Sequence, residues 1–375
     1  MVPAALTRSA ALAIALALLA GCSRDRRPPP EWQSRVLGTD AAFEDVFFAD
    51  SLNGWIAGGS YFIAGGIVGR TRDGGRTWKF TSDIAGVGSA GRWFLLNSIQ
   101  FTDTLTGLVA GDGGRILKTE DGGASWRVVK KSHSSSGIIT DLDMLDRLNG
   151  WAVGPSGVAR TRDGGETWEQ LTHSDSEQEP SWSRAVAILD EHRAIKVGQH
   201  GDIEATFDGG MRWEVVPTPL EAGEKPYLFD VCFPDGRHGW IVGENGTIIH
   251  SSDGGASWTR QFTGLADAKE RPRPPGSVPG PPGMEEVEGP LKGLFLARVF
   301  FLDELRGWTT GYWTDQGRSV VLRTVDGGAT WAIEAEAMGE ELRALVVHAD
   351  GHGWAVGDRS REGPQTLLVR SPLAP

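Results

Sequence analysis

Several features that mark common protein classes are scarce in this sequence. Its 375 residues include only 2 cysteines, which rules out a disulfide framework. Basic residues are outnumbered, because 37 Lys and Arg face 49 Asp and Glu for a net charge of −12. Nucleic-acid binding depends on a basic face, so we predict no nucleic-acid partner. The apolar run from Ala10 to Ala20 spans 11 residues, whereas a membrane helix needs about 20.

Signatures of catalysis and of metal binding are also missing. We find no phosphate-binding glycine loop and no Cys/His spacing typical of zinc sites. A sialidase would need an arginine triad, a Tyr–Glu nucleophile pair and an Asp acid, but the chain has 3 tyrosines and no Arg-Ile-Pro element. His348 and His352 flank Asp350 in the manner of a metal triplet, yet Asp350 is also part of a repeated pattern. We therefore predict no metal, no cofactor and no catalytic residue.

The N-terminus resembles the signal of a bacterial lipoprotein. Arg8 precedes the apolar run, which ends in Leu19-Ala20-Gly21-Cys22, a small-residue cleavage site directly before a cysteine. We predict that residues 1–21 are a cleaved signal peptide, that Cys22 carries the lipid, and that residues 22–30 form a Pro- and Arg-rich tether. The serine after the cysteine favours the outer membrane, with the protein facing the periplasm. The alternative is a plain secretory signal with a chance cysteine.

The chain is rich in glycine, with 52 in all, and many of these glycines belong to a repeat. The sequence Ser/Thr-x-Asp-Gly-Gly-x-x-Trp occurs six times, mostly at spacings of 42–48 residues. Asp-Gly-Gly suits a hairpin turn, since Asp accepts backbone amides and Gly tolerates positive φ. The recurring residues are Asp73, Asp121, Asp163, Asp208, Asp253 and Asp326, with Trp78, Trp126, Trp168, Trp213, Trp258 and Trp331.

A second marker counts seven units rather than six. It is an Asp followed five residues later by an aromatic or aliphatic residue and then by a Gly, and the last copy is one residue shorter. Each unit divides into four short strands, and four strands at this period are typical of a propeller blade. The seventh unit lacks its fourth strand, while residues 31–36 resemble an unattached one. We therefore predict an all-β, seven-bladed propeller over residues 31–375, closed by the N-terminal strand that contains Trp32.

The repeat carries a family resemblance. The Ser/Thr-x-Asp-x-Gly-x-x-Trp element resembles the Asp-box, or bacterial neuraminidase repeat, of sialidases and other propellers. The whole unit is similar to the photosystem II stability/assembly factor family, over about residues 31–375. This resemblance implies a seven-bladed propeller, export, a lipid anchor as in cyanobacterial members, and a chaperone-like role towards a newly inserted membrane subunit. It also implies an arginine-rich patch, which cannot be aligned residue by residue with this sequence.

A periodic set of basic side chains is the first candidate surface. Six of the seven units carry a residue that can be cationic at the place three residues before the box Asp, and equivalent positions in a ring share one radius. We expect these residues to form a basic arc that binds an acidic segment of a membrane or envelope protein. The alternative is that each pairs with an acidic group on the next blade. The set is Arg70, Lys118, Arg160, His250, Arg323 and Arg370.

The second candidate surface is the mouth of the central channel, where the innermost strands begin. Mixed charges gather there, and they either bind a ligand or simply solvate the channel: Asp45, Asp141, Asp230, Arg184, Arg298 and Arg343. Residues 264–292 form a Pro/Gly-rich insertion, which we expect to be a loop that either docks on a partner or is merely tolerated. Cys232 lies in an apolar run, so we expect a buried structural thiol.

These patterns together predict a monomeric, non-catalytic, lipid-anchored protein that helps to assemble or stabilise a membrane or envelope protein. The alternative is a carbohydrate-active Asp-box propeller, either a hydrolase or a glycan-binding protein. The two differ in geometry. A hydrolase needs two solvent-facing carboxylates about 5–10 Å apart in a cleft, whereas protein binding needs a surface of complementary charge.

Overall fold

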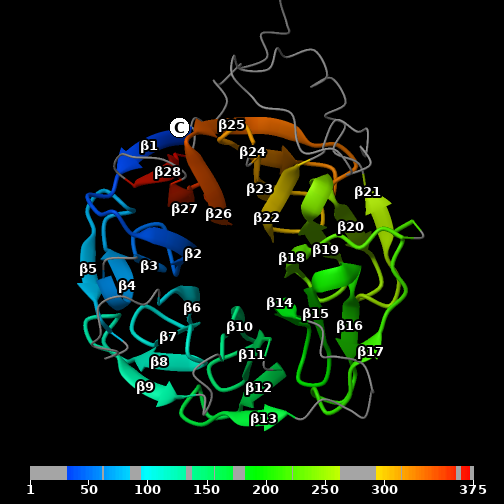
Figure 1. Ribbon diagram of the computed structural model, residues 1–375, viewed down its shortest axis with the longest axis horizontal. Coiled ribbons are helices and arrows are strands. Elements are labelled where there is room, and N and C mark those ends of the chain that lie inside the picture. The colour runs from blue at the N-terminus through cyan, green and yellow to red at the C-terminus, as the bar shows by residue number, and fades with distance from the viewer. Residues whose placement is uncertain are drawn as a thin grey trace, which may run out of the picture.

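The computed structural model describes residues 32–60, 63–84, 94–131, 137–155, 157–171, 182–221, 223–261, 293–313, 315–359 and 365–371. These residues form seven four-stranded antiparallel sheets, arranged as blades around a central axis (Figure 1). The prediction of an all-β, seven-bladed propeller is thereby confirmed. No helix in the described part of the chain has the length and apolarity to cross a membrane. The predicted signal peptide, Cys22, the tether to residue 30 and the insertion 264–292 lie outside the described residues.

Each blade runs from an innermost strand at the axis to an outermost strand at the rim. Blades 1 to 3 are β2 (Ala42–Phe48), β3 (Gly54–Ser60), β4 (Ile63–Thr71) and β5 (Lys79–Ser82); β6 (Leu96–Phe101), β7 (Gly107–Gly111), β8 (Arg115–Thr119) and β9 (Arg127–Lys130); and β10 (Asp141–Met144), β11 (Gly150–Gly154), β12 (Gly157–Thr161) and β13 (Glu169–Leu171). Blades 4 and 5 are β14 (Ser183–Ile188), β15 (Ala194–Gly198), β16 (Ile203–Thr206) and β17 (Glu214–Val215); and β18 (Leu228–Cys232), β19 (Gly239–Gly243), β20 (Ile248–Ser251) and β21 (Thr259–Gln261). Blades 6 and 7 are β22 (Leu294–Phe301), β23 (Gly307–Trp313), β24 (Arg318–Thr324) and β25 (Ala332–Met338); and β26 (Glu340–Val347), β27 (Gly353–Arg359), β28 (Thr366–Arg370) and β1 (Trp32–Val36). Two 3-10 turns, η1 (Gln199–Gly201) and η2 (Glu244–Gly246), complete the described secondary structure.

The ring has two different faces. The turn after the innermost strand and the Asp-box turn after the third strand lie together on one face, which we call the box face. In blade 2 the two turns are joined, because the Gly122 amide donates to the Leu105 carbonyl over 2.8 Å. The innermost strands begin on the opposite face, which we call the mouth face.

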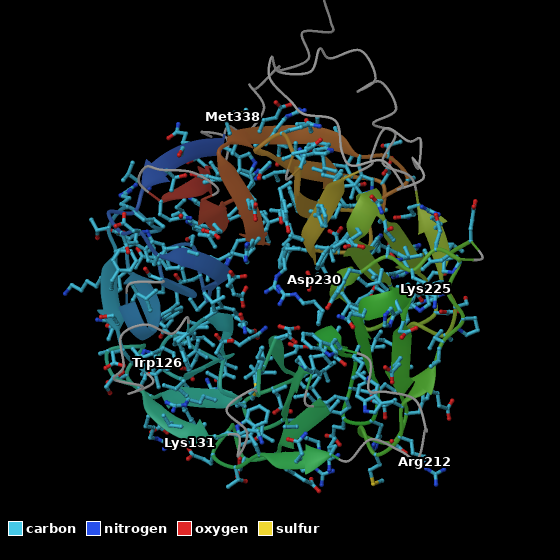
Figure 2. All side chains as sticks on the ribbon, viewed as in Figure 1. Trp126, Lys131, Arg212, Lys225, Asp230 and Met338 are labelled. Carbon is cyan, nitrogen blue, oxygen red and sulfur yellow. The ribbon has the colours of Figure 1, made fainter. Side chains whose placement is uncertain are left out.

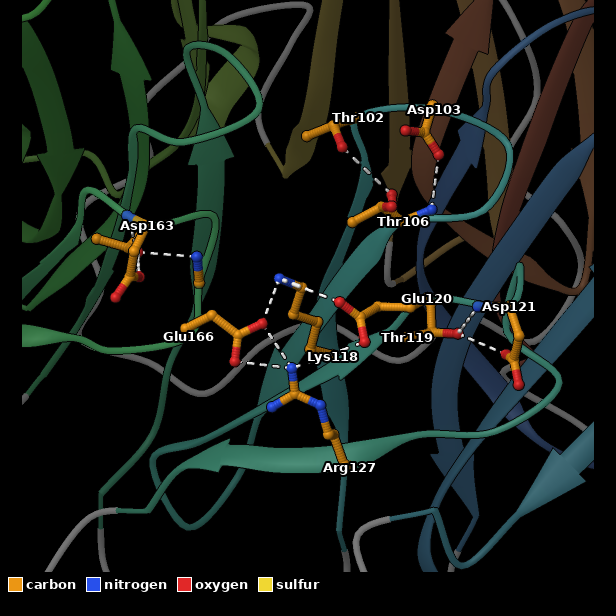
Figure 3. Close-up of polar contacts among 12 residues, drawn as sticks. Thr102, Asp103, Thr106, Lys118, Thr119, Glu120, Asp121, Arg127, Asp163 and Glu166 are labelled. Atoms are coloured by element: carbon orange, nitrogen blue, oxygen red, sulfur yellow. Dashed lines mark hydrogen bonds and ion pairs between the residues drawn. The ribbon is translucent and has the colours of Figure 1, made fainter.

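Each Asp-box turn is held by the side chains that recur in its sequence. In blade 2 the Thr119 hydroxyl donates to Asp121 Oδ1 over 2.8 Å (Figure 3), and the Gly123 amide donates to Thr119 Oγ1 over 2.9 Å. The hydroxyl and the amide of Ser125 donate to the two Asp121 oxygens over 2.6 and 2.9 Å. Gly122 and Gly123 have φ of 70° and 82°, a region that other residues enter only with strain. The carboxylate of the box Asp is therefore used to build the turn.

Aromatic rings join neighbouring blades. Trp55 of blade 1 stacks on Phe101 of blade 2, with ring centroids 3.6 Å apart. Gly107 leaves room for the Phe101 ring, since a Cβ at that position would lie 2.6 Å from it. The Trp55 indole N–H donates to the carbonyl of Gly122 in the box turn of blade 2 over 2.9 Å. The Gly-Trp element thus serves two blades, because its Gly accommodates the aromatic ring of its own blade and its Trp covers that of the next.

The ring closes as predicted, by pairing of β1 with β28. The first strand, drawn in blue, lies beside the last strand, drawn in red (Figure 1). Trp32 is opposite Arg370, and Arg370 is opposite Gly353, whereas the glycine of blade 1 is opposite the box residue Thr71. Trp32 therefore takes the place of a box Trp in blade 7, which confirms its role in ring closure.

The register also corrects one alignment made from the sequence. Arg370 takes the place of a box Thr, and Val369 takes the place equivalent to Arg70, because Val369 is opposite Trp354. The last unit has no Asp-box from which to count, and this caused the shift of one residue. The Arg370 guanidinium compensates for the missing turn, since Nη1 donates to the Gly351 carbonyl over 2.5 Å.

Glu334 of β25 replaces the missing Asp-box at the seam between blades 6 and 7. Trp308 has no box carbonyl to reach, and its indole N–H donates to Glu334 Oε2 over 2.9 Å. The Trp32 indole donates to the same oxygen over 3.1 Å, and Arg370 Nη2 donates to Oε1 over 3.1 Å. The side chains of Arg370 and Glu334 are only 6% and 8% exposed, so their ion pair is buried. Two indole N–H groups and one guanidinium, from blades 6 and 7, thus depend on one carboxylate.

Glu334→Ala should destabilise the protein by about 3–5 kcal/mol, because it leaves a buried guanidinium and two indole N–H groups without their acceptor. Urea unfolding followed by tryptophan fluorescence measures this change. Glu191→Ala, on an exposed turn of blade 4, is the matched control and should change stability by no more than about 0.5 kcal/mol. Equal stability of the two variants would contradict the role of Glu334 in closing the ring.

Candidate functional site

The six predicted basic residues lie at the blade boundaries, and none of them is classed as exposed. Lys118 Nζ lies 2.7 Å from Glu166 Oε1 of blade 3, which Arg127 also binds (Figure 3). Arg160 Nη1 donates over 2.6 Å to the carbonyl of Gly209 in the box turn of blade 4. Both cations therefore contact the next blade, but only Lys118 meets an acidic group there, because the ion pair of Arg160 is with Glu169 of its own blade.

The other members of the set also turn towards protein. Arg70 Nη1 donates over 3.3 Å to the box turn of blade 2. Burial and the neighbouring His238 lower the pKa of His250, which favours its neutral form. Arg323 and Arg370 both lie beside Glu334. The set thus forms a belt within the blade boundaries, and partner binding by these residues stays a prediction.

The channel is lined by one layer of charged side chains at equivalent positions. Asp45, Asp141, Asp230 and Arg298 each lie opposite the residue two places after the Trp of the second strand, as the register shows. Each of the three aspartates accepts a backbone amide from the next blade, at 2.9, 3.0 and 2.8 Å respectively. The buried aspartates therefore clamp alternate blade boundaries, from blade 1 to 2, 3 to 4 and 5 to 6.

Arg298 neutralises part of this layer. Its guanidinium reaches from blade 6 past blade 7 to Asp45 of blade 1, with Nη2 and Oδ1 2.5 Å apart, and Nη1 lies 3.6 Å from Asp230 Oδ1. Figure 2 shows Asp230 at the centre of the ring. The Arg298 side chain is 24% exposed, whereas those of Asp45 and Asp230 are 1% and 7% exposed. One cation thus bridges carboxylates across the channel.

Negative charge exceeds positive charge in this layer, and burial raises the carboxyl pKa values. Burial raises the pKa of Asp230 to about 7, although Arg298 opposes this shift. Burial likewise raises the pKa of Asp143 to about 6; this residue of β10 also accepts the Ile188 amide over 2.9 Å. Burial also raises the pKa values of Asp45 and Asp141, and Asp143 was not singled out from the sequence.

A row of aromatic side chains lies at the mouth-face end of blades 5 and 6, near the start of their innermost strands. Tyr227 stacks on Phe229 with centroids 5.5 Å apart, Phe229 lies 6.1 Å from Phe295, and Phe295 stacks on Tyr312 at 5.4 Å. All four side chains are half-buried. Arg184 acts electrostatically on the Tyr312 hydroxyl, whose pKa burial raises. We call these five residues the mouth cluster.

The mouth cluster depends on β-bulges that the sequence does not reveal. Glu44, Arg184, Phe229 and Arg343 are each the extra residue of a bulge near the start of an innermost strand. A bulge turns its extra residue away from the regular alternation. The sequence analysis identified Arg184 and Arg343 here but missed the aromatic residues, because aromatic residues in a predicted strand are usually assigned to the hydrophobic core.

The two arginines at this level differ in their partners. Arg343 Nη1 lies 2.5 Å from Glu44 Oε1, and Nη2 lies 3.3 Å from Glu341 and 3.6 Å from Asp358. Arg184 has no carboxylate within 4.0 Å among the described residues, and it is half-buried. Of the two arginines at this level, Arg184 is therefore the one without a carboxylate partner in the described part of the chain.

One group of side chains on the box face has the composition of a metal site. The ligand atoms of Asp235, His238 and Glu304 lie within 4.8 Å of one another. His238 Nδ1 contacts Asp235 Oδ2 at 2.7 Å, the same turn contact that Asn53 makes with Asp50 in blade 1. We therefore interpret the His238 contact as part of the turn. Near the C-terminus, His348 Nε2 contacts the Phe48 carbonyl, and so it does not converge with His352.

Comparison with known proteins places this chain in a family. The sequence profile of the family described as photosynthesis system II assembly factor YCF48 matches residues 26–138 and 180–269, somewhat more than half of the chain. The chain belongs to the YCF48 family. The resemblance found in the sequence is thereby confirmed. No curated protein sequence matches the chain.

Two solved YCF48 structures share the fold. One, described as YCF48 bound to D1 peptide, is 18% identical with a TM-score of 0.63, and the alignment covers 94% of this chain and 100% of that one. YCF48 from Cyanidioschyzon merolae is 17% identical with a TM-score of 0.66, covering 90% and 98%. The GH74 xyloglucanase from Xanthomonas campestris is 13% identical with a TM-score of 0.57, covering 90% of this chain and 55% of that one. At such identities these likenesses show the propeller fold alone.

Asp230→Asn should change the pH dependence of stability. The folded state keeps the Asp230 proton up to a pKa of about 7, whereas the unfolded chain releases it near 3.8. The native protein therefore loses stability as the pH rises from about 4 to about 7, by roughly a few kcal/mol from this residue. The variant lacks that loss, so its stability relative to the native protein should improve with pH across this range. Urea unfolding at pH 4.5, 6 and 8 measures it, and a constant difference would contradict the shifted pKa.

Proposed function

We propose that this chain is a lipid-anchored, non-catalytic assembly factor that holds an extramembrane segment of a membrane or envelope protein at the mouth cluster. The observation that carries the proposal is the row of four half-buried aromatic side chains on blades 5 and 6, together with Arg184 of blade 4. Arg184 acts electrostatically on Tyr312 and has no carboxylate within 4.0 Å among the described residues. Membership of the YCF48 family and the relative described as bound to D1 peptide support the same kind of partner.

The aromatic row suits a polypeptide ligand. Tyr and Phe supply large apolar contact areas with few rotatable bonds, and such residues dominate the binding energy of protein interfaces. Tyr227 and Tyr312 end the row with hydroxyl groups that can bond to a peptide backbone. The row extends over β18, β22 and β23, so a bound segment would lie across blades 5 and 6.

The charge at the mouth favours an acidic segment. Arg184 can form a charge-assisted, bidentate pair with a carboxylate, which adds both affinity and orientation. Arg343 is already neutralised by Glu44, Glu341 and Asp358, so it contributes less. The protein itself carries a net charge of −12, so a cation such as Arg184, which has no carboxylate partner among the described residues, favours an acidic ligand segment at the mouth.

Aspartates of the Asp-box turns and of the channel are engaged in building the fold, which supports a non-catalytic role. The box Asp121 has its pKa lowered to about 2 by the hydroxyl and amide of Ser125, so it stays ionised and bound within its turn. The channel aspartates Asp45, Asp141 and Asp230 hold amides of the next blade. The likeness to a xyloglucanase is one of fold, and no contact in the described residues favours the carbohydrate-active alternative.

The remaining parts of the proposal follow from the N-terminal sequence. The lipobox-like segment ending at Cys22 supports an anchor in the bacterial envelope, with the propeller in the periplasm and the outer membrane favoured by Ser23. We propose a monomer, because each of the seven blades has its four strands from one chain, and no blade needs a strand from a second copy.

The partner can be identified by photo-crosslinking. We expect p-benzoylphenylalanine in place of Phe229 to crosslink to an extramembrane segment of a membrane or envelope protein in native membranes, and mass spectrometry identifies the segment. The same label at Lys131, on the outer rim (Figure 2), is the control and should give no such product. Equal products from both positions would contradict binding at the mouth.

A synthetic peptide of the crosslinked segment then tests the role of Arg184. Arg184→Glu should weaken peptide binding roughly 10- to 100-fold, as expected for loss of a charge-assisted hydrogen bond of about 1.5–3 kcal/mol. Lys131→Glu makes the same change of net charge at the rim and should alter the affinity by less than about twofold, because solvent and salt screen distant charges. Fluorescence anisotropy measures both, and equal effects would mean that Arg184 acts only through net charge.

A further inference from the structure

The box face carries an unusual share of the exposed apolar side chains. Of the 12 large hydrophobic residues classed as exposed in the described part of the chain, seven lie in turns on this face. Four are leucines at the same turn position in blades 1, 2, 3 and 6, and each is 51–56% exposed: Leu52, Leu105, Leu148 and Leu305. The other three belong to Asp-box turns and are 56–63% exposed: Phe207, Met211 and Val325.

The leucines stand on rigid supports. The Leu105 amide donates to Asp103 Oδ1 over 2.8 Å, and the Leu105 carbonyl accepts the Gly122 amide over 2.8 Å. Leu52, Leu148 and Leu305 make the same pair of contacts in their own blades. Both backbone groups of each leucine are thus bound within the blade, while the side chain stays in solvent. Scattered exposed leucines need no explanation, but a set fixed at one height on one face does.

The chain enters the ring on this same face. Trp32 begins β1 opposite Arg370, and the Arg370 guanidinium binds the carbonyl of Gly351, the counterpart of Leu52 in blade 7. The entry point therefore lies between Leu305 of blade 6 and Leu52 of blade 1. Nine residues lie between Cys22 and Trp32, so the Cα atoms of these two residues can be at most about 36 Å apart. An anchor at Cys22 would hold the box face, rather than the mouth face, next to the membrane.

We infer that the box face rests on the phospholipid bilayer and that its seven apolar side chains enter the boundary between headgroups and acyl chains. This inference rests on the lipid anchor of the proposed function. Apolar side chains arranged on one face around the point where the tether begins can enter a flat membrane together, and each side chain that becomes buried there adds to the membrane affinity. The face also carries side chains of both charges, for example Arg147 and Asp146. Because these charges offset each other, the contact depends on insertion of the apolar side chains rather than on attraction to anionic lipid.

The orientation can be measured with nitroxide labels on the full lipidated chain in phosphatidylcholine vesicles. Leu105→Cys places a label on the box face, and Lys225→Cys places one on an exposed residue that precedes β18 at the mouth face (Figure 2). Burial raises the pKa of the Cys232 thiol to about 12, so this cysteine does not compete for the label. We expect the label at 105 to be more accessible to oxygen than to a water-soluble nickel chelate, and the label at 225 to show the reverse.

The outcomes separate the possible occupants of this face. Equal access of nickel chelate to both labels, or preferential access of oxygen at 225, would overturn the inference. Protection at 105 from both reagents would also overturn it, since that result means that protein covers the face, either a second copy or a partner. Vesicles with added phosphatidylglycerol should give the same result as phosphatidylcholine alone, and a contact formed only with the anionic lipid would likewise overturn the inference.

A second variant tests the leucines themselves. The fourfold variant combines Leu52→Gln, Leu105→Gln, Leu148→Gln and Leu305→Gln, which change only exposed side chains. A label at Met211→Cys reports on the same face. The fourfold variant should lose the preference of this label for oxygen, whereas Leu52→Gln alone should keep most of it. Mass spectrometry of Cys22 tests the anchor separately, and crosslinking from position 229 tests the proposed function. Failure of one therefore does not imply failure of the others.

Discussion

The architecture depends on one hydrogen bond that is repeated at blade boundaries. The tryptophan of a second strand is covered by the neighbouring blade, and its buried indole N–H must find an acceptor there. Trp55, Trp240 and Trp354 donate to carbonyls of the glycines that follow the box Asp in the next blade. A buried donor without an acceptor costs about 1–3 kcal/mol. The Asp-box is therefore as much a device for joining blades as a turn, and its absence from one blade has to be compensated.

Blade number and ring closure could be predicted from the sequence, because both depend on counting markers at a regular period. What failed was counting where the marker is absent, as for Arg370, which lies one residue from the predicted position. Glu334 could not be predicted either. Glu334 lies three residues after the box residue Trp331, as Gln261 lies three residues after Trp258 in blade 5. This spacing alone does not indicate that several hydrogen-bond donors meet at Glu334.

The belt and the mouth show what periodicity can and cannot tell. Equivalent positions share a radius, so Lys118 and Arg160 were correctly placed on one ring, but the period does not say whether a side chain points to solvent or to the next blade. The mouth cluster arises where the units differ. Its arginine and Phe229 occupy bulges, and a bulge is set by backbone geometry rather than by a residue pattern. A function that breaks the symmetry of a repeat is thus the hardest part to find from the repeat.

The closing blade gives the fold a mechanical character. Its outer strand, β1, is the first strand that the structure describes, so any pull exerted on the residues before Trp32 acts on β1 along its length. Such a force shears the five residue pairs between β1 and β28 together instead of unzipping them one by one. The carboxylate of Glu334 holds the end of the strand at which the pull arrives. If the propeller is tied to a membrane that moves, the force therefore acts on the boundary between β1 and β28. Next to that boundary, the Glu334 carboxylate accepts hydrogen bonds from Trp32, Trp308 and Arg370.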